Sequence, residues 1–145
     1  MTDNKKLVYR AGMIPYIIED NQIKMMFMIP SNSEFGGPLP QIAKGKVEYD
    51  EDYKTAAIRE AKEELGLFVG NVVLVEEVGL FMGRTTVFVS KIKDVDMFGL
   101  PEDETESTQW LTMEQFMEQG RSLHQPVVQS AYRKICKIEN IESTI

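Results

Sequence analysis

The first third of the chain shows two apolar runs separated by a polar turn. Residues 7–18 and 23–29 are rich in apolar and β-branched side chains, and residues 19–22 between them are polar. Two such runs joined by a short polar segment predict a β-hairpin. The next segment, residues 31–40, is rich in Gly, Pro and Ser and predicts a loop.

Three later segments show helical character. Residues 51–65 contain no Pro or Gly and are rich in Ala, Glu, Lys and Leu, which favour helix. Asp50 is the predicted N-cap, and Gly66 is the predicted residue that ends this helix. Residues 113–119 predict a short helix, and residues 126–138 show the apolar periodicity of a longer one. The stripe of the first helix that we expect to face the core consists of Tyr53, Ala57, Ala61 and Leu65.

The order of the predicted elements bounds the fold. Residues 72–80 and 85–92 predict two strands joined by a turn through Gly83, residues 94–106 are acidic and irregular, and residues 108–111 predict a short strand. Strands, a helix, strands and then helices follow one another, and this order predicts an α+β fold rather than a doubly wound parallel sheet. The length of 145 residues suits one domain with its own core, so we expect residues 1–145 to form a single domain.

One segment carries a specific pattern of charged residues and glycines. It runs from Gly45 to Leu67 and follows G-x5-E-x7-R-E-U-x-E-E-x-G-U, where U is an apolar residue. Seven positions of this pattern are fixed residue types. At a background usage of about 7% for each, a chance match is on the order of one in 10⁸ per starting position. The signal is therefore far stronger than that of a lone glycine motif.

Three glutamates of this segment point to metal chemistry. Glu60, Glu63 and Glu64 lie at i, i+3 and i+4, so their carboxylates share one face of the predicted helix. Like charges at this spacing repel one another, and acids near the end of a helix also oppose its dipole. A divalent cation with oxygen ligands, such as Mg²⁺ or Mn²⁺, would offset this repulsion. The alternative is a solvated acidic face interlaced with basic side chains.

The complete pattern resembles the Nudix box, and every specified position is filled. The resemblance implies the Nudix fold, a mixed β-sheet sandwiched between α-helices. It implies that Glu60, Glu63 and Glu64 hold Mg²⁺, or Mn²⁺ in its place, and that a main-chain carbonyl at Gly45 completes the metal shell. It also implies that Arg59 pairs with neighbouring acids and orients the metal-binding glutamates.

Other residues near the box have simpler interpretations. Glu51 lies near the helix start, where a negative charge suits the dipole without a catalytic role, and we interpret it as structural. Gly45 and Lys44 are expected in the loop ahead of the helix. Glu48 is a common extra acid of the family's loop, and both a ligand role and no ligand role stay open for it.

The reaction implied by the resemblance is hydrolysis of a phosphoanhydride in a nucleoside diphosphate linked to another group X. Water would attack, and a carboxylate would take its proton. Family members place this base either in the box or in a later loop, which here spans residues 101–110. Glu104 and Glu106 are the candidates in that loop, and the alternative is an acidic, solvated segment.

Basic residues are expected to contact the phosphates of the substrate. The candidates are Arg10, Lys44, Lys46 and Arg84. Arg84 lies in a predicted turn, so a solvated turn residue is its alternative interpretation. His124, the single histidine, is expected to be a helix-start or surface residue rather than an acid or base.

Substrate identity is not fixed by the box. Markers that several Nudix subfamilies carry downstream of it are missing from residues 81–84. The segments from Tyr9 and from Pro40 also resemble the small Nudix hydrolases of large tailed phages, which implies ADP-ribose, diadenosine polyphosphates or flavin adenine dinucleotide as substrates. One alternative is a hydrolase that decaps RNA 5′ ends. Another is a catalytically silent Nudix module that binds nucleotides or regulates, although such modules are expected to lose box glutamates.

Composition narrows the partners. The net charge of −7 argues against a dedicated nucleic-acid surface, which needs clustered Lys and Arg. The apolar runs are too short for a membrane span, and the N-terminus has no secretory signal, so a cytoplasmic protein is expected. Cys136, the one cysteine, is expected to be buried in the last helix. A homodimer is possible by analogy with the family.

Overall fold

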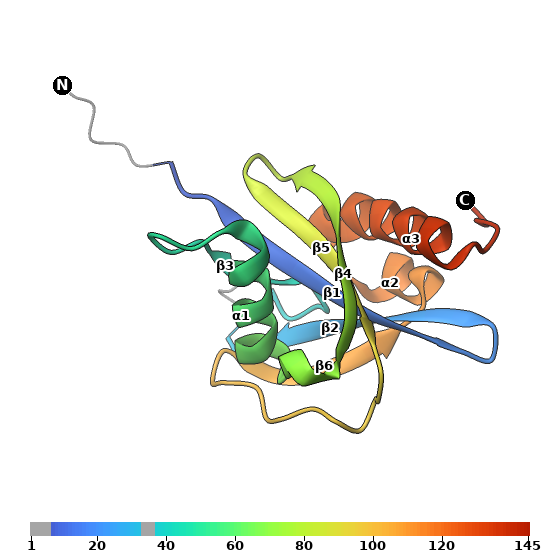
Figure 1. The fold of residues 1–145 in the computed structure, drawn as a ribbon, viewed down its shortest axis with the longest axis horizontal. Helices are drawn as coiled ribbons and strands as arrows, with labels where there is room; N and C mark the ends of the chain where they lie inside the picture. The colour runs from blue at the N-terminus through green and yellow to red at the C-terminus, as the bar shows by residue number, and fades with distance from the viewer. Residues whose placement is uncertain (1–6, 33–36) are drawn as a thin grey trace.

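The computed structural model describes residues 7–32 and 37–145 and shows a mixed sheet with helices on both faces (Figure 1). The predicted hairpin, the two strands after the box and the three helices are all confirmed. In chain order the elements are β1 (Arg10–Glu19), β2 (Gln22–Pro30), β3 (Ala43–Lys46), α1 (Tyr53–Leu65), the 3-10 turn η2 (Val69–Asn71), β4 (Val72–Phe81), β5 (Thr85–Ile92), β6 (Thr105–Leu111), α2 (Met113–Gln119), η3 (Ser122–His124) and α3 (Gln125–Glu139).

Strand β1 is the centre of the sheet. The strand order is β4-β5-β1-β2-β6, and β3 also pairs with β1. Residues 10–16 of β1 pair in parallel with β5, and residues 10–13 pair antiparallel with β3. The C-terminal end of β1, residues 16–19, pairs antiparallel with β2. The sheet is therefore mixed, as expected for the Nudix fold.

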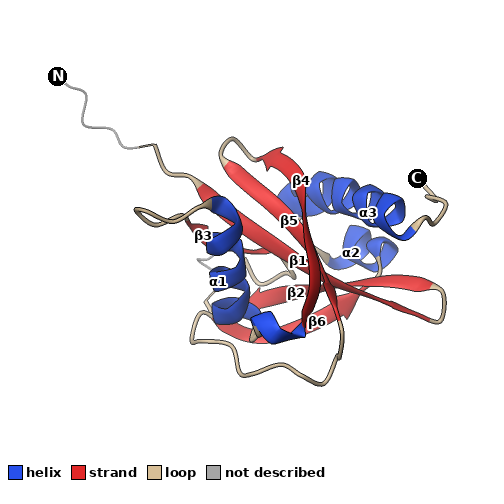
Figure 2. Ribbon diagram, in the orientation of Figure 1, coloured by secondary structure: helices blue, strands red, loops and turns tan. Residues whose placement is uncertain are grey.

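Side chains alternate between two cores along β1. Ala11 and Met13 pack with α1 on one face of the sheet, and Ile14 and Tyr16 pack with α2 and α3 on the other. This alternation follows from the two-residue period of a strand. Figure 2 shows the helices on either side of the strands. Cys136 is buried in α3, as predicted.

Helix α1 begins two residues later than predicted. The N-cap is Asp52, whose carboxylate accepts a hydrogen bond from the Thr55 N–H group at 2.7 Å. Asp50 instead adopts a left-handed φ of 67° in the preceding turn. Gly66 ends the helix at a φ of 75°, as predicted. The predicted stripe is buried except for Tyr53, which is 40% exposed.

Two other predictions about local structure need correction. Lys44 and Gly45 lie in strand β3 and not in a loop, because β3 pairs with the start of β1. Strand β6 begins at Thr105, so Glu106 lies in a strand and not in the irregular segment. The predicted loop over residues 31–40 falls partly on residues 33–36, which lie outside the described residues.

The long loop between β5 and β6 returns to the C-terminal end of α1 (Figure 2). The Gly99 N–H group donates to the Gly66 carbonyl, and the Glu102 N–H group donates to the Glu63 carbonyl, both at 2.7 Å. These bonds bring the acidic part of the loop beside the box helix. Within the described residues, no helix combines the length and apolar character that crossing a membrane requires.

Candidate active site

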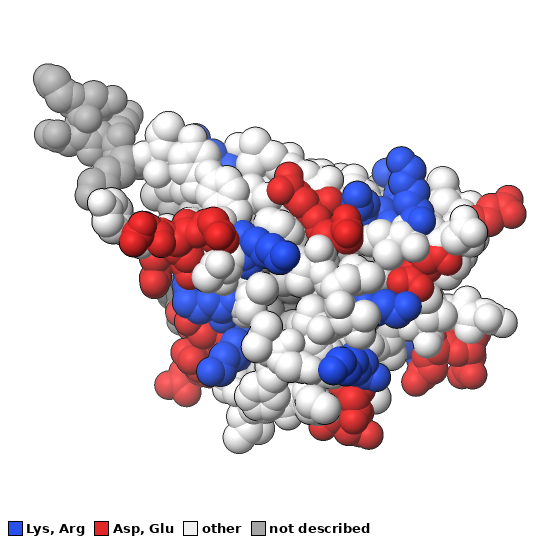
Figure 3. All heavy atoms as spheres, viewed as in Figure 1, with Lys and Arg blue, Asp and Glu red and all other residues white. Residues whose placement is uncertain are grey.

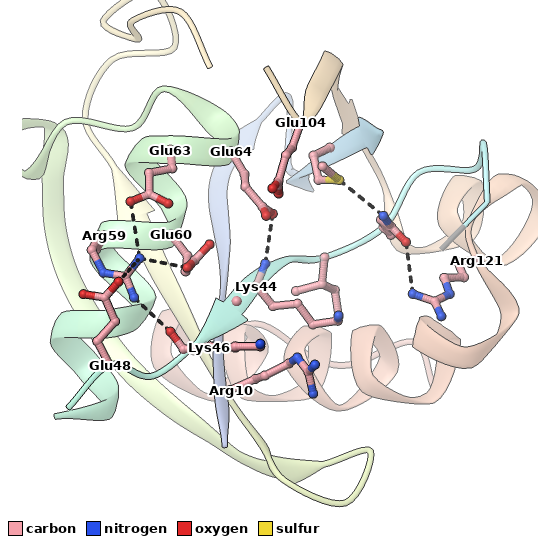
Figure 4. A pocket seen from close by; sticks show the side chains of 14 residues that line it. Arg10, Lys44, Lys46, Glu48, Arg59, Glu60, Glu63, Glu64, Glu104 and Arg121 are labelled. Carbon is pink, nitrogen blue, oxygen red and sulfur yellow. Dashed lines mark hydrogen bonds and ion pairs between the residues drawn. The ribbon is translucent and has the colours of Figure 1, made fainter. Parts of the chain in front are cut away.

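A cleft of about 740 Å³ lies between α1, β3 and the link that follows α2. Figure 4 shows most of the glutamates, with Arg59 among them, on the side of α1 and the β5–β6 loop, and the other basic side chains across from them. The acidic lining consists of Glu48, Glu60, Glu63, Glu64 and Glu104. The basic lining beyond the box arginine consists of Arg10, Lys44, Lys46 and Arg121.

The box glutamates differ in burial. Glu60 and Glu64 are only 8% and 9% exposed, although both are charged residue types. Burial raises the pKa of Glu60, and burial together with the nearby Glu60 raises the pKa of Glu64 to about 8. The Lys44 N–H group donates to Glu64 Oε1 at 3.1 Å, which favours the carboxylate and partly opposes that rise.

Arg59 connects the acids of the box. Its Nε and Nη2 atoms donate to the two carboxylate oxygens of Glu51 at 2.8 and 3.0 Å, a bidentate pair. Its Nη1 atom donates to Glu60 Oε2 at 2.9 Å and to Glu63 Oε2 at 3.3 Å. Nη2 also donates to the Lys46 carbonyl at 2.9 Å. Glu51 therefore positions Arg59, which in turn bonds to Glu60 and Glu63, and this arrangement agrees with a structural role for Glu51.

Gly45 lies directly under the Glu60 carboxyl group. A Cβ atom built at this position would overlap the Cδ and both Oε atoms of Glu60. The φ of Gly45 is not left-handed, so lack of space rather than backbone conformation requires glycine here. Strand β3 thus brings the backbone of the box against Glu60, the first of the three glutamates proposed to share a helix face.

The structure separates the two candidate acids of the later loop. Glu104 lines the cleft and also an adjoining hollow of about 360 Å³, which it shares with Glu63 and Glu64. Glu106 is exposed on β6 and lines neither space. Their sequence separation of two residues gave no indication of this difference.

The predicted phosphate-binding residues are also divided. Arg10, Lys44 and Lys46 line the cleft. Arg84 lies instead at a separate hollow of about 200 Å³, where its Nε atom donates to the Val8 carbonyl at 3.3 Å. The side chain that sequence reasoning missed is Arg121.

The protein-family model described as the NUDIX domain matches residues 10–131 of the chain. The chain belongs to the Nudix family. A sequence search of curated proteins finds no match.

Solved Nudix structures share the fold at low sequence identity. The Caenorhabditis elegans Ap4A hydrolase, in a binary complex, is 18% identical with a TM-score of 0.72, over 90% of this chain and 99% of that one. The NUDIX domain of Shewanella oneidensis NrtR, complexed with ADP ribose, is 12% identical with a TM-score of 0.73, over 90% of each chain. A mutT/nudix family protein from Listeria innocua is 17% identical with a TM-score of 0.68, over 92% of this chain and 96% of that one.

The donor set of this Nudix box fits a divalent cation in its chemistry. Mg²⁺ and Mn²⁺ take carboxylate oxygens, and a cation beside two buried carboxylates would favour their charged forms. Across residues 7–32 and 37–145, no three Asp, Glu, His or Cys side chains already converge as a metal-binding group. Glu60 and Glu63 are bonded to Arg59 instead, and Glu64 to the backbone of Lys44.

His124 was predicted to be a helix-start or surface residue. It lies at the start of α3, but it is not on the surface. Its side chain is fully buried, and its Nδ1 atom accepts a hydrogen bond from the Ile42 N–H group at 3.0 Å. Burial and the charge of Arg121 lower the pKa of His124 to about 3, so the ring is neutral. The imidazole therefore fixes the segment that enters the Nudix box.

Proposed function

We propose that this Nudix protein is a divalent-metal-dependent pyrophosphohydrolase. It would cleave the phosphoanhydride of a nucleoside diphosphate linked to another group X, releasing a nucleotide and X-phosphate. The observation that carries the proposal is the division of one cleft into a wall of box carboxylates and a wall of cations. Such a cleft suits an anionic phosphate chain with a metal ion between the chain and the carboxylates.

The proposed metal ligands are Glu60, Glu63 and Glu64, with the carbonyl of Gly45. Mg²⁺, or Mn²⁺ in its place, supplies charge withdrawal from phosphate oxygens and a lowered pKa for a bound water. Arg59 is proposed as a positioning residue, because it bonds to two of these glutamates while Glu51 holds it in place.

The proton of the attacking water needs a carboxylate acceptor. Water adds to one phosphorus atom, its proton passes to the carboxylate, and the bridging oxygen leaves with the other phosphate. Glu104 is our candidate outside the box, because it lines the same cleft as the box glutamates. Glu106 ranks below it, because its exposed position on β6 lies outside the cleft.

The proposed substrates are ADP-ribose, diadenosine polyphosphates and flavin adenine dinucleotide. Structures with the same fold carry the names Ap4A hydrolase and a NUDIX domain complexed with ADP ribose, which supports adenine nucleotides as the first to test. Phosphates of any of these would meet Arg10, Lys44 and Lys46 on the basic wall.

The test is product-resolved chromatography of a substrate panel with Mg²⁺, and with Mn²⁺ in parallel. The panel contains the three proposed substrates, NADH, nucleoside triphosphates and RNA with a 5′-triphosphate. The variant is Glu64→Gln, and the matched control is Glu118→Gln on the exposed face of α2. We expect Glu64→Gln to lower turnover by several orders of magnitude and the control to match the wild type. Equal activity of both variants would remove Glu64 from the proposed site.

The same panel decides between the alternatives. Cleavage of the RNA alone would favour a decapping hydrolase, but the basic side chains on the face in Figure 3 are scattered among acidic ones and form no stripe. No cleavage of any substrate would favour a binding module. One observation supports the binding-module hypothesis: another solved structure of NrtR is complexed with a 27mer DNA. This protein covers 62% of that NrtR chain.

A further inference from the structure

Arg121 is an unpredicted component of the cleft wall. It lies in the link between α2 and η3, far along the chain from the Nudix box. Its N–H group donates to the Pro40 carbonyl at 2.9 Å, and its Nη1 atom donates to Gln41 Oε1 at 3.1 Å. Figure 4 shows it on the side of the cleft away from Glu60 and Glu63. The backbone and the side chain of Arg121 are thus both held by the segment that leads into β3.

Arg121 retains most of its hydrogen-bonding capacity. A guanidinium carries five N–H donors, and only the Nη1 atom of Arg121 donates to another side chain of the described residues. The His124 Nε2 atom lies 3.4 Å from Nη1. Because Nδ1 of this neutral ring accepts from a backbone N–H group, Nε2 carries the hydrogen, so two donors face each other here.

The cations around Arg121 are also without acidic partners. Within residues 7–32 and 37–145, no carboxylate forms an ion pair with Arg121, Arg10 or Lys44, whereas Arg59 pairs with several. Lys44, Arg10 and Arg121 line the same cleft. Positive charges that line one cleft repel one another, and a bound anion offsets this repulsion.

We propose that Arg121, held by Gln41, forms an anion subsite for a phosphate of the substrate that lies outside the cleaved anhydride. This inference rests on the proposed function, and it adds a specificity-determining residue to that function. The fork of Arg121 supplies two parallel donors, a geometry that matches phosphate oxygens, and Lys44 and Arg10 supply the surrounding charge. Substrates with a phosphate beyond the two of the cleaved linkage gain this contact.

The experiment measures binding without the reaction. Inorganic tripolyphosphate is titrated calorimetrically into the protein in the presence of EDTA, so neither metal nor catalysis contributes. Arg121→Gln removes the guanidinium. Gln41→Glu keeps it but places a carboxylate beside Nη1, where it competes with the phosphate. The matched control is Arg133→Gln, which removes one positive charge from α3 outside the cleft.

We expect about tenfold weaker binding in Arg121→Gln and in Gln41→Glu, in line with the loss of a charge-assisted hydrogen bond. The control should bind within about twofold of the wild type. Thermal melting checks that each variant is folded. If Arg121→Gln no longer melts cooperatively, the tripolyphosphate affinity of Gln41→Glu tests the subsite in its place.

Three outcomes would overturn the subsite. They are unchanged binding in the folded variants, an equal loss in the control, and no saturable binding by the wild type. Because no outcome depends on hydrolysis, the subsite and the proposed reaction can fail separately.

Discussion

Replacing Gly45 with alanine tests whether the Glu60 carboxylate must lie where the structure places it. The added methyl group would overlap three atoms of that carboxyl group. Gly45 is also held within the sheet, because β3 pairs it with Ala11 in the central strand. The strand cannot move away without breaking this pairing, so the carboxylate has to move.

The size of the effect follows from the burial of Glu60. The residue is 8% exposed and bonded to Arg59 at 2.9 Å, so its side chain has little free space to enter. Overpacking of this kind costs about 1–3 kcal/mol of folding free energy. A displacement of about 1 Å in a group that positions the reaction lowers the rate by about 10²-fold. We therefore expect a folded Gly45→Ala protein with about 10²-fold lower kcat/KM.

The assay combines metal-dependent turnover with urea unfolding. The matched control is Gly70→Ala, because a Cβ atom at Gly70 meets nothing within 4 Å and its φ is not left-handed. The control should retain the wild-type kcat/KM. If Gly45→Ala keeps kcat/KM within about threefold of the wild type, the position of the Glu60 carboxylate does not matter for the reaction, and the reasoning fails.

Three further predictions concern stability. The pKa of His124 is 6.5 in the unfolded chain and about 3 in the folded one. Between these two pH values only the unfolded chain binds the proton. The free energy of unfolding therefore falls by about 1.4 kcal/mol for each pH unit from pH 6.5 down to pH 3. Urea unfolding at pH 7, 6 and 5 should show a shallower loss in His124→Gln, and parallel curves would contradict this. Gly66→Ala should cost about 2–4 kcal/mol, because its left-handed φ is combined with a clash against a carbonyl of the β5–β6 loop. Gly83→Ala has a similar φ but open space, so an equal loss in chemical denaturation would leave no role for the clash. Tyr16→Phe removes a hydrogen bond of 2.7 Å to Glu139 on α3 and should lower the free energy of unfolding by about 1–3 kcal/mol. An unchanged urea midpoint would refute this prediction.

Local patterns predicted the elements of the fold well. The hairpin, the strands after the box and the helix from Met113 to Gln119 depend on periodicity and on nearby turn residues, so the sequence contains the information directly. Strand β3 was missed because its four residues have no alternation of their own and become a strand only by pairing with β1. The N-cap was misplaced because Asp50 and Asp52 are both suitable residue types. The left-handed turn at Asp50 decided between them.

The candidate site was predictable only where it is local in sequence. The glutamates of the box share a face because helical spacing requires it, and their cleft-lining positions agree with that prediction. Glu104 could not be distinguished from Glu106, since the choice depends on where the β5–β6 loop bonds to α1. Arg121 had no motif to identify it. Its bond to Gln41 joins residues 80 positions apart, so only the folded chain shows it.

The acidic balance of the protein has a specific arrangement at this cleft. Arg59 is paired with carboxylates of the box, and its bidentate pair with Glu51 keeps it from reaching a substrate. The cations on the opposite wall have no such partners among the described residues, so they stay available to an anion. A net charge of −7 therefore coexists with a locally basic surface, which we expect to attract phosphate. The box helix supplies only the acidic half of this arrangement. The basic half comes from β1, β3 and the link after α2. Of its four cations only Lys46 belongs to the Nudix box, so we expect recognition of the substrate to depend largely on residues outside the box.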